Sequence, residues 1–243
     1  YLKDAGSIMA IHHFDHGEGL NLAIAVSDEP NRFDEDNLAN QILTSNLFGR
    51  SMNNLVTARQ LQETTERLDA ELKVVGEIQR SLLPRDLPEI PGLTIETSYE
   101  TAQRAGGDYF DLFELDDGRW GILIADVSGH GTPAAVLMAI THAIAHAYAG
   151  PHPPTAGFLE YVNNRLTETY TNGSGAFVTA FYAVYDPRTL TLDYTSAGHP
   201  PPRLRRGHKI IALDQGGGLP LGLFPDQHYG NATITLEPDD ILV

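Results

Sequence analysis

A chain of 243 residues with 42% hydrophobic residues is long enough and apolar enough for one large globular domain or two small ones. Its formal net charge of −16, with only 16 lysines and arginines, argues against a nucleic-acid partner, because binding to a phosphate backbone requires a basic surface. The absence of cysteine excludes disulfides and zinc–thiolate sites, and no apolar run approaches the roughly 20 residues that cross a bilayer, so we predict a cytoplasmic protein with no membrane partner.

The first thirty residues predict a β-hairpin. Residues 8–14 lead through a glycine-containing turn into residues 20–27, where apolar residues alternate with small or polar ones as in a strand with one apolar face. Two strands alone do not make a stable domain. Together with the turn after Pro30 and the helix that follows, the hairpin resembles the last third of a GAF domain. We therefore assign residues 1–33 to the C-terminal part of an α/β GAF-like sensor domain.

One long helix or two nearly continuous ones are predicted next, because residues 34–83 contain no proline and only two glycines. Polar Gln79 interrupts a stripe of apolar residues near the a and d positions of a heptad repeat, namely Leu61, Leu68, Leu72, Val75 and Leu82. We favour a parallel two-stranded coiled coil, and hence a homodimer, over a helix packed along its own domain. A proline-rich segment from Pro84 ends the helix, so the predicted linker covers residues 34–90.

From residue 92 the pattern changes to short strands around a pair of helices. We predict the helices at 133–148 and 156–170. The predicted strands precede and follow the helix pair, at 93–99, 108–115, 120–127, 177–185, 190–196 and 232–236. This order describes an α+β layered domain over residues 91–243 rather than a βαβ repeat.

Two aspartates flank one predicted hairpin of this domain. Asp108 begins the first strand and Asp126 lies near the end of the second, which places both carboxylates at one edge of the sheet. The basic residue between them, Arg119, belongs to the turn at the far end. A divalent cation would compensate for the repulsion of the paired carboxylates. The alternative is that each aspartate caps a local turn, as Asp beside Gly commonly does.

A second candidate motif is weaker. His142 and His146 are four positions apart on the first predicted helix, the spacing of two histidines that bind one metal ion. No glutamate follows His142 as the HExxH motif requires, so we assign no metal to this pair. The segment around Ser128 also lacks the first glycine of a nucleophile elbow, which argues against a serine hydrolase.

Five longer motifs follow one another along the second half of the chain: GGDYFD at 106–111, ADVSGHG at 125–131, FVTAFYAVYD at 177–186, SAGHPPPRL at 196–204 and GGGLPLG at 216–222. In order and approximate spacing they resemble the PPM-type serine/threonine phosphatases of the sporulation stage II E and sigma-factor regulatory class. The resemblance covers about residues 75–243. It implies the αββα layered sandwich of that family.

The resemblance also implies a centre of two Mn²⁺ or Mg²⁺ ions. Asp126 would bridge both ions, Asp108 would bind one, and the backbone carbonyl of Val127 would complete a position. Asp108 and Asp126 are therefore the expected catalytic residues, and the family forms no phosphoenzyme. Asp111 is expected beside the metal ligands, with a strand residue that faces solvent as the alternative. No catalytic role is assigned to His199 of the SAGHPPPRL motif.

The sequence departs from the family at its end. Family members carry further metal-binding aspartates after a strand like residues 240–243, and this sequence stops at Val243. We therefore expect a phosphatase domain truncated at its C-terminus, and little activity from this chain alone.

The predicted function is a metal-dependent phosphoserine/phosphothreonine protein phosphatase in bacterial signalling. Its predicted substrate is a phosphorylated anti-anti-sigma regulator of the STAS type, and its activity would be controlled by the N-terminal sensor. The alternative is a non-catalytic, dimerising signalling module in which the phosphatase fold is degenerate and serves as a binding surface.

Overall fold

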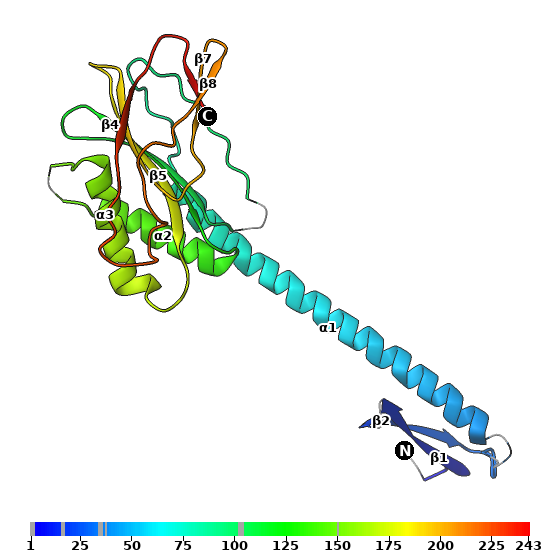
Figure 1. Ribbon diagram of the computed structural model, residues 1–243. Helices are drawn as coiled ribbons and strands as arrows, with labels where there is room; N and C mark the ends of the chain where they lie inside the picture. Colours follow the sequence, from blue (N-terminus) through cyan, green and yellow to red (C-terminus); the bar gives the residue numbers. More distant parts are fainter. Residues whose placement is uncertain (1–2, 16–17, 34–35, 37, 102–104, 150) are drawn as a thin grey trace. The chain divides into compact units, whose positions relative to one another are not determined.

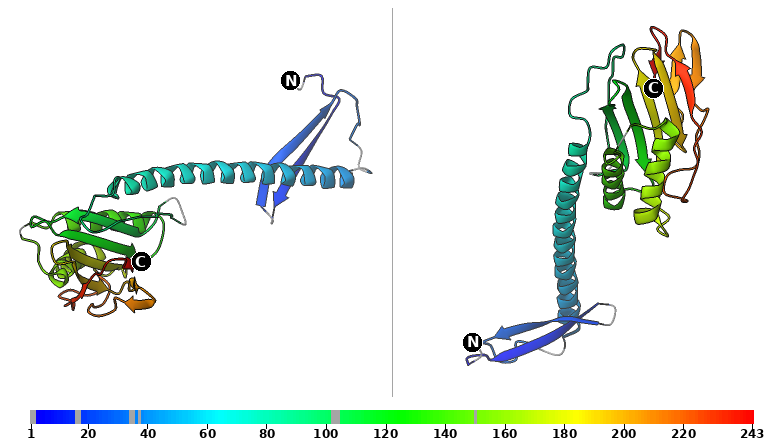
Figure 2. Two further views of the ribbon diagram at one scale, coloured as in Figure 1. Left: turned by 90° about the horizontal axis from the view of Figure 1, so that it is seen from above. Right: turned by 90° about the vertical axis from the view of Figure 1, so that its left-hand side faces the viewer.

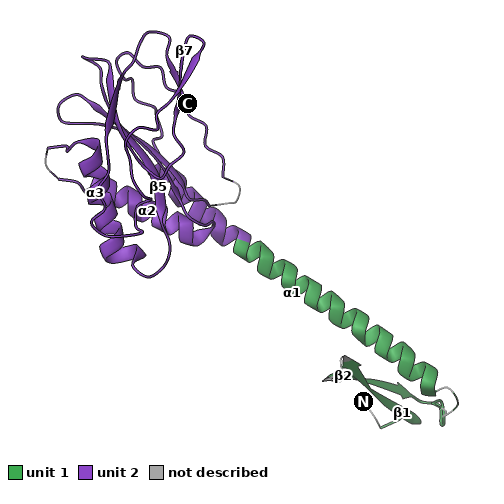
Figure 3. Ribbon diagram, in the orientation of Figure 1, with its two compact units in different colours: residues 1–68 green, residues 69–243 purple. Residues whose placement is uncertain are grey.

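The computed structural model describes residues 3–15, 18–33, 36, 38–101, 105–149 and 151–243. The chain divides into two compact units, Tyr1–Leu68 and Asp69–Val243 (Figure 3). The boundary between the units falls within helix α1 (Leu38–Leu82). The finer division into residues 1–33, 34–90 and 91–243 stays a prediction.

The first unit contains the predicted hairpin, formed by strands β1 (Ser7–Asp15) and β2 (Glu18–Ser27). The buried His13 joins it to α1, because its Nδ1 lies 2.5 Å from Asn21 Oδ1 and its Nε2 lies 2.6 Å from Ser45 Oγ. Apolar side chains of the hairpin nevertheless remain exposed, with Ile24 at 61%. The resemblance of this unit to a GAF domain stays a prediction.

The predicted long helix is confirmed as one continuous element, α1. Its apolar stripe has two environments. Leu61 and Leu68 are 67% and 54% exposed, whereas Leu82 packs against the core of the second unit. Only the part of α1 before its last turns therefore exposes apolar residues that could face a partner helix in a coiled coil. The homodimer stays a prediction.

The second unit holds a five-stranded antiparallel sheet in the order β3-β4-β5-β6-β9, drawn in Figure 1. Its strands are β3 (Asp108–Glu114), β4 (Trp120–Val127), β5 (Val178–Asp186), β6 (Thr191–Ala197) and β9 (Ala232–Thr235). A smaller sheet has the order β10-β7-β8, from β10 (Ile241–Leu242), β7 (Arg203–Arg206) and β8 (Lys209–Ala212). The helices are α2 (Thr132–His146) and α3 (Thr155–Leu166), continued by the π-turn η1 (Thr167–Thr171).

The five-stranded sheet separates two hydrophobic cores, because side chains alternate between the faces of each strand. On β5, Tyr182 packs with the helix residue Phe158 in the first core, whereas Phe181 packs in the second core with Leu204 of β7. Helices α2 and α3 both lie on the first face, as the turned views show (Figure 2). The α+β layered fold predicted from the sequence is confirmed.

Some predicted elements are wrong. Residues 93–99 form no strand; Leu93 and Ile95 pack against the second core without joining a hydrogen-bonded ladder. Conversely, β7 and β8 were not predicted, because strands of four residues give too little alternation to read. Strand β10 lies within residues 240–243, which were expected to form a strand. Within the described ranges, no helix combines the length and the apolar character that a membrane span requires.

Candidate metal centre

The predicted pairing of Asp108 with Asp126 is present in the structure. The two residues are direct partners in the antiparallel register of β3 and β4, as the hairpin spacing predicts. Facing residues in such a ladder have Cβ atoms about 4.5–5.5 Å apart and point to the same face. Because residues 109 and 127 face the helices, Asp108 and Asp126 lie on the opposite face of the sheet. Both side chains are exposed.

Gly107 allows the backbone to approach two oxygen atoms beside this pair closely. A Cβ atom at this glycine would lie 2.6 Å from the carbonyl oxygen of Val127 and 3.0 Å from Oδ1 of Asp126. These two oxygens therefore lie close together, next to a backbone that carries no side chain. Carboxylate and carbonyl oxygens are the ligands that hard divalent cations prefer.

The electrostatics of the pair also fit a cation. Although Asp126 is exposed, partial loss of solvent around its carboxyl raises the pKa above its ordinary value, and the negative charge of Asp108 raises it further. His199 acts in the opposite direction on the same group. A bound cation would relieve the repulsion between the carboxylates, so the donor set fits the divalent ion that the sequence analysis expected.

The loop after Asp126 is held by backbone contacts. Ser128 donates its N–H to the carbonyl of Phe177 at 2.9 Å, and its Oγ accepts the N–H of Phe177 at 2.9 Å. Gly129 has φ 94° and Gly131 has φ 71°, a left-handed backbone that glycine adopts without a steric cost. Gly131 then caps α2, whose Pro133 suits the first turn of a helix. The ADVSGHG motif is thus a rigid strand-to-helix connection.

His199, to which the sequence analysis assigned no catalytic role, lies beside the strand that carries Asp126. Its Nδ1 is 2.9 Å from Thr179 Oγ1, and Thr179 is the register partner of Asp126 on β5. Burial lowers the pKa of the His199 imidazole, although Asp126 and Asp108 oppose this effect. An open groove of about 400 Å³ adjoins it, lined by His199, Ser196, Asp214 and residues 216–218.

The last turns of α1 hold the segment that leads into Asp108. Gln79 is 3% exposed and makes two hydrogen bonds with Gly106: its Nε2 donates to the Gly106 carbonyl at 2.6 Å, and its Oε1 accepts the Gly106 N–H at 3.0 Å. In the sequence Gln79 is only an interruption of the apolar stripe. The structure shows it as a polar clamp on the GGDYFD motif.

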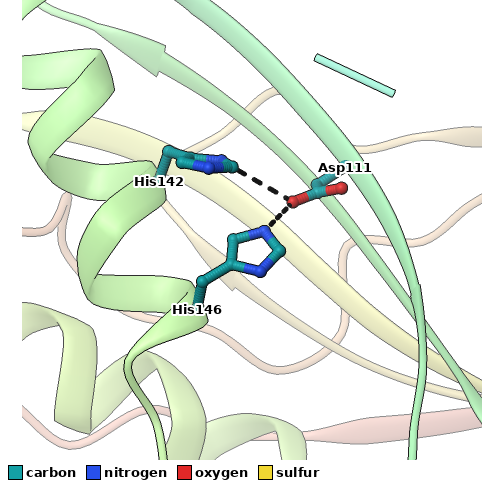
Figure 4. Close-up of side chains that lie close together, drawn as sticks. All are labelled: Asp111, His142 and His146. Atoms are coloured by element: carbon teal, nitrogen blue, oxygen red, sulfur yellow. Dashed lines mark hydrogen bonds and ion pairs between the residues drawn. The ribbon is translucent and has the colours of Figure 1, made fainter. Parts of the chain in front are cut away.

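Asp111 does not lie beside the predicted metal ligands, and it does not face solvent. It is three residues after Asp108 on β3 and therefore points to the opposite face, where it is 5% exposed beneath α2. Its Oδ2 lies 2.5 Å from Nε2 of His146 and 3.9 Å from Nδ1 of His142 (Figure 4). Both sequence-based interpretations of Asp111 are wrong for this reason.

The Asp111 cluster includes one more polar group. The hydroxyl of Tyr109 donates to Asp111 Oδ2 at 2.7 Å and lies 3.0 Å from His142 Nδ1. Although burial acts to raise the pKa of Asp111, hydrogen bonds from His146 and Tyr109 lower it overall. The Asp111 carboxylate raises the pKa of His146, while burial lowers that of His142. Asp111 is therefore ionised at neutral pH.

Comparison with known proteins identifies similar sequences over most of the chain. The family described as stage II sporulation protein E (SpoIIE) matches residues 116–243. The phosphoserine phosphatase RsbU of Bacillus subtilis (strain 168) is 30% identical over 199 residues, which cover 81% of this chain and 57% of RsbU. The phosphoserine phosphatase RsbP of the same organism is 24% identical over 175 residues, 71% of this chain and 43% of RsbP.

A solved structure agrees with the fold. The SiaA-PP2C domain of Pseudomonas aeruginosa superposes with a TM-score of 0.61 at 22% sequence identity, covering 74% of this chain and 71% of that one. At this identity the similarity shows the fold alone. The chain spans 43% of RsbP and 57% of RsbU, so it corresponds to about half the length of these relatives.

Proposed function

The chain belongs to the stage II sporulation protein E (SpoIIE) family, and from that membership we propose that it is a metal-dependent phosphatase acting on phosphoserine or phosphothreonine in a protein. The observation that carries the proposal is the pairing of Asp108 with Asp126 across β3 and β4, beside the Val127 carbonyl. The relatives named phosphoserine phosphatases support the same reaction class.

In this proposal Asp108, Asp126 and the carbonyl of Val127 hold divalent cations, Mn²⁺ or Mg²⁺. Such ions, when bound, acidify water and neutralise the charge of a phosphoryl group, which is the chemistry that in-line hydrolysis requires. The protein contributes position: the register of β3 and β4 fixes the carboxylates, and the missing side chain of Gly107 allows its backbone to lie close to Asp126 and the Val127 carbonyl. Thr179 and Ser128 hold the neighbouring His199 and the loop after Asp126.

The proposed substrate is a phosphorylated anti-anti-sigma regulator of the STAS type. This assignment rests on the family resemblance, since RsbU and RsbP carry the name phosphoserine phosphatase. The open groove beside His199 is a suitable surface for an extended protein segment, because it is lined by glycine backbone and by His199, which contacts the register partner of Asp126. A protein substrate needs such an open surface, whereas a small metabolite is usually enclosed.

We also propose that α1 carries control from an N-terminal sensor and dimerises the protein. Two observations support this. The exposed leucines of α1 before its last turns suit a helical partner, and Gln79 near its end holds the segment that positions Asp108. A rotation or shift of α1 would therefore act directly on the proposed metal site.

The direct test is hydrolysis of a phosphoserine-containing STAS protein by the complete protein with Mn²⁺, with Mg²⁺ and with a chelator. We expect turnover only with a metal. Asp126→Asn is expected to reduce turnover by roughly 10²–10³-fold, the usual cost of removing one charge-stabilising group from an active site. Asp226→Asn is the matched control, because Asp226 is exposed and asparagine tolerates its φ of 54°. Full activity of the Asp126→Asn protein would overturn the proposal, and no turnover under any metal condition would favour the non-catalytic alternative.

A further inference from the structure

We propose that Asp111, His142 and His146 form a binding site for a transition-metal ion such as Zn²⁺, separate from the proposed centre at Asp108 and Asp126. The three residues come from β3 and α2, on the face of the five-stranded sheet that the helices cover (Figure 4). This inference does not depend on the proposed phosphatase function.

The three side chains converge on one point. One potential ligand atom from each lies within 4.8 Å of the other two, and the shared neighbour of both histidines is Oδ2 of Asp111. Among the residues that the structure describes, no other group of three histidine or acidic side chains meets this condition. The convergence therefore distinguishes this cluster from the many exposed acidic residues of the chain.

The helix supplies the histidines with the correct spacing. Residues four apart on an α-helix lie above one another on one face, and the rings of His142 and His146 have centroids only 4.3 Å apart. From the sequence, no metal was assigned to this pair because no glutamate follows His142 as the HExxH motif requires. The structure supplies the missing carboxylate from β3 instead.

The donor atoms select the class of metal. Two imidazole nitrogens with one carboxylate oxygen are the ligand set of zinc and related transition metals, which bind three protein ligands and keep a further position for water. Mg²⁺ and Mn²⁺ prefer oxygen ligands, as offered by Asp108, Asp126 and Val127. The two sites are thus expected to discriminate between metals.

The surrounding groups are those that orient metal ligands. The Leu112 N–H donates to Asp111 Oδ1 at 2.8 Å, and the Tyr109 hydroxyl donates to Asp111 Oδ2 at 2.7 Å. Such outer contacts fix the direction of a ligating carboxylate. Burial and the nearby Asp111 raise the pKa of Tyr109, so its hydroxyl keeps the proton that it donates.

Metal binding requires small movements of both histidines. Ligands about 2.0–2.1 Å from a tetrahedral ion are separated by roughly 3.3 Å, so His146 must retreat from its 2.5 Å contact with Asp111 and His142 must approach from 3.9 Å. His146 belongs to the last turn of α2, and its side chain is 46% exposed, so its ring has room to rotate. A pocket of about 210 Å³, lined in part by His146, Phe113 and His152, gives solvent access to this side of the cluster.

The test is a titration of the purified, tag-free protein with Co²⁺, a spectroscopic substitute for Zn²⁺, in the presence of excess Mg²⁺. We expect a visible absorption band that saturates at one ion per chain and that Zn²⁺ abolishes. His142→Ala and His146→Ala should each weaken Co²⁺ binding by more than the roughly 10–100-fold that outer contacts contribute. Tyr109→Phe, which keeps the ring and removes the hydroxyl, should weaken Co²⁺ binding by an amount within that 10–100-fold range.

Two controls separate this site from others. His208→Gln removes an exposed histidine outside the cluster and should leave Co²⁺ binding unchanged. Asp126→Asn should also leave it unchanged, because that residue lies on the other face of the sheet. Circular dichroism of every variant establishes that α2 is still folded. The proposal is overturned if the folded histidine variants keep the cobalt band, or if Asp126→Asn removes it.

Discussion

Gln79 and Gly106 are joined by a reciprocal pair of hydrogen bonds, 2.6 Å and 3.0 Å long, between a helix side chain and the backbone of the GGDYFD motif. Gly106 is two residues before Asp108, so the end of α1 and the proposed metal site share one short segment of chain.

Replacement of Gln79 by alanine is expected to leave the N–H and carbonyl of Gly106 without their partner. A buried polar group that loses its hydrogen bond costs about 1–3 kcal/mol, so the free energy of unfolding should fall by about that amount. Gln62→Ala is the matched control on the same helix, because its Nε2 donates to the exposed Glu66. Its effect should stay within about 0.5 kcal/mol. Urea unfolding measures both, and equal effects of the two substitutions would contradict the clamp.

Gly107→Ala is expected to weaken Mn²⁺ binding by about 10–100-fold while the protein remains folded. Mutation of residues that orient metal ligands typically lowers metal affinity by this amount. The new Cβ would lie 2.6 Å from the Val127 carbonyl oxygen, which belongs to the backbone and cannot move aside cheaply. The neighbouring Gly106→Ala is the control, since its Cβ would meet the side chain of Thr101 at 3.1 Å and no backbone atom among the described residues. Calorimetric titration with Mn²⁺ distinguishes them. Similar Mn²⁺ affinities of the two variants would show that the oxygens beside Gly107 do not hold the ion.

The lowered pKa of His152 predicts that the free energy of unfolding decreases in acid. Burial, and secondarily Arg119, lowers its pKa below the ordinary value of 6.5, with Asp117 and Asp116 in opposition. In the unfolded chain His152 therefore binds a proton near pH 6.5, whereas in the folded protein it binds a proton only at lower pH. Below that pH the unfolded state binds more protons, so the free energy of unfolding decreases as the pH falls.

His152→Gln should reduce this pH dependence, because glutamine retains hydrogen-bonding capacity toward the Tyr182 hydroxyl but does not titrate. Urea unfolding at about pH 5.5 and about pH 8, on either side of the histidine range, gives the comparison. His208→Gln, at an exposed position, serves as the control. An unaltered difference between the two pH values in the His152→Gln protein would rule out His152 as the source.

The exposed leucines of α1 predict a helical dimer. Burial of one leucine contributes about 1.5–3 kcal/mol, so the double substitution Leu61→Ser and Leu68→Ser should weaken the dimer by about 100-fold or more. Glu63→Ser with Ala70→Ser is the control pair, with the same seven-residue separation on the outer side of the predicted heptad. Light scattering over a range of concentrations measures the dissociation. A monomer at high concentration before any substitution would refute the dimer.

The sequence alone was sufficient for features that depend on neighbours along the chain. The pairing of Asp108 with Asp126 follows from a hairpin whose turn fixes the register, so counting residues from the Asp-Asp-Gly turn predicts it. The length of α1 follows in the same way from an uninterrupted run without proline. The ordered motifs that resemble the phosphatase family are also local in sequence, and the family assignment therefore did not need coordinates.

Only the tertiary structure decided which distant residues meet. Asp111 contacts His142 and His146 because α2 packs on one face of the sheet. Asp111 and Asp108 point to opposite faces of β3, and their surroundings differ only because α2 covers one of these faces. Gln79 reaches Gly106 because the end of α1 docks on the same core. These contacts depend on how the side chains of different elements pack together. No pattern within a single helix or strand specifies which side chains of another element it will meet.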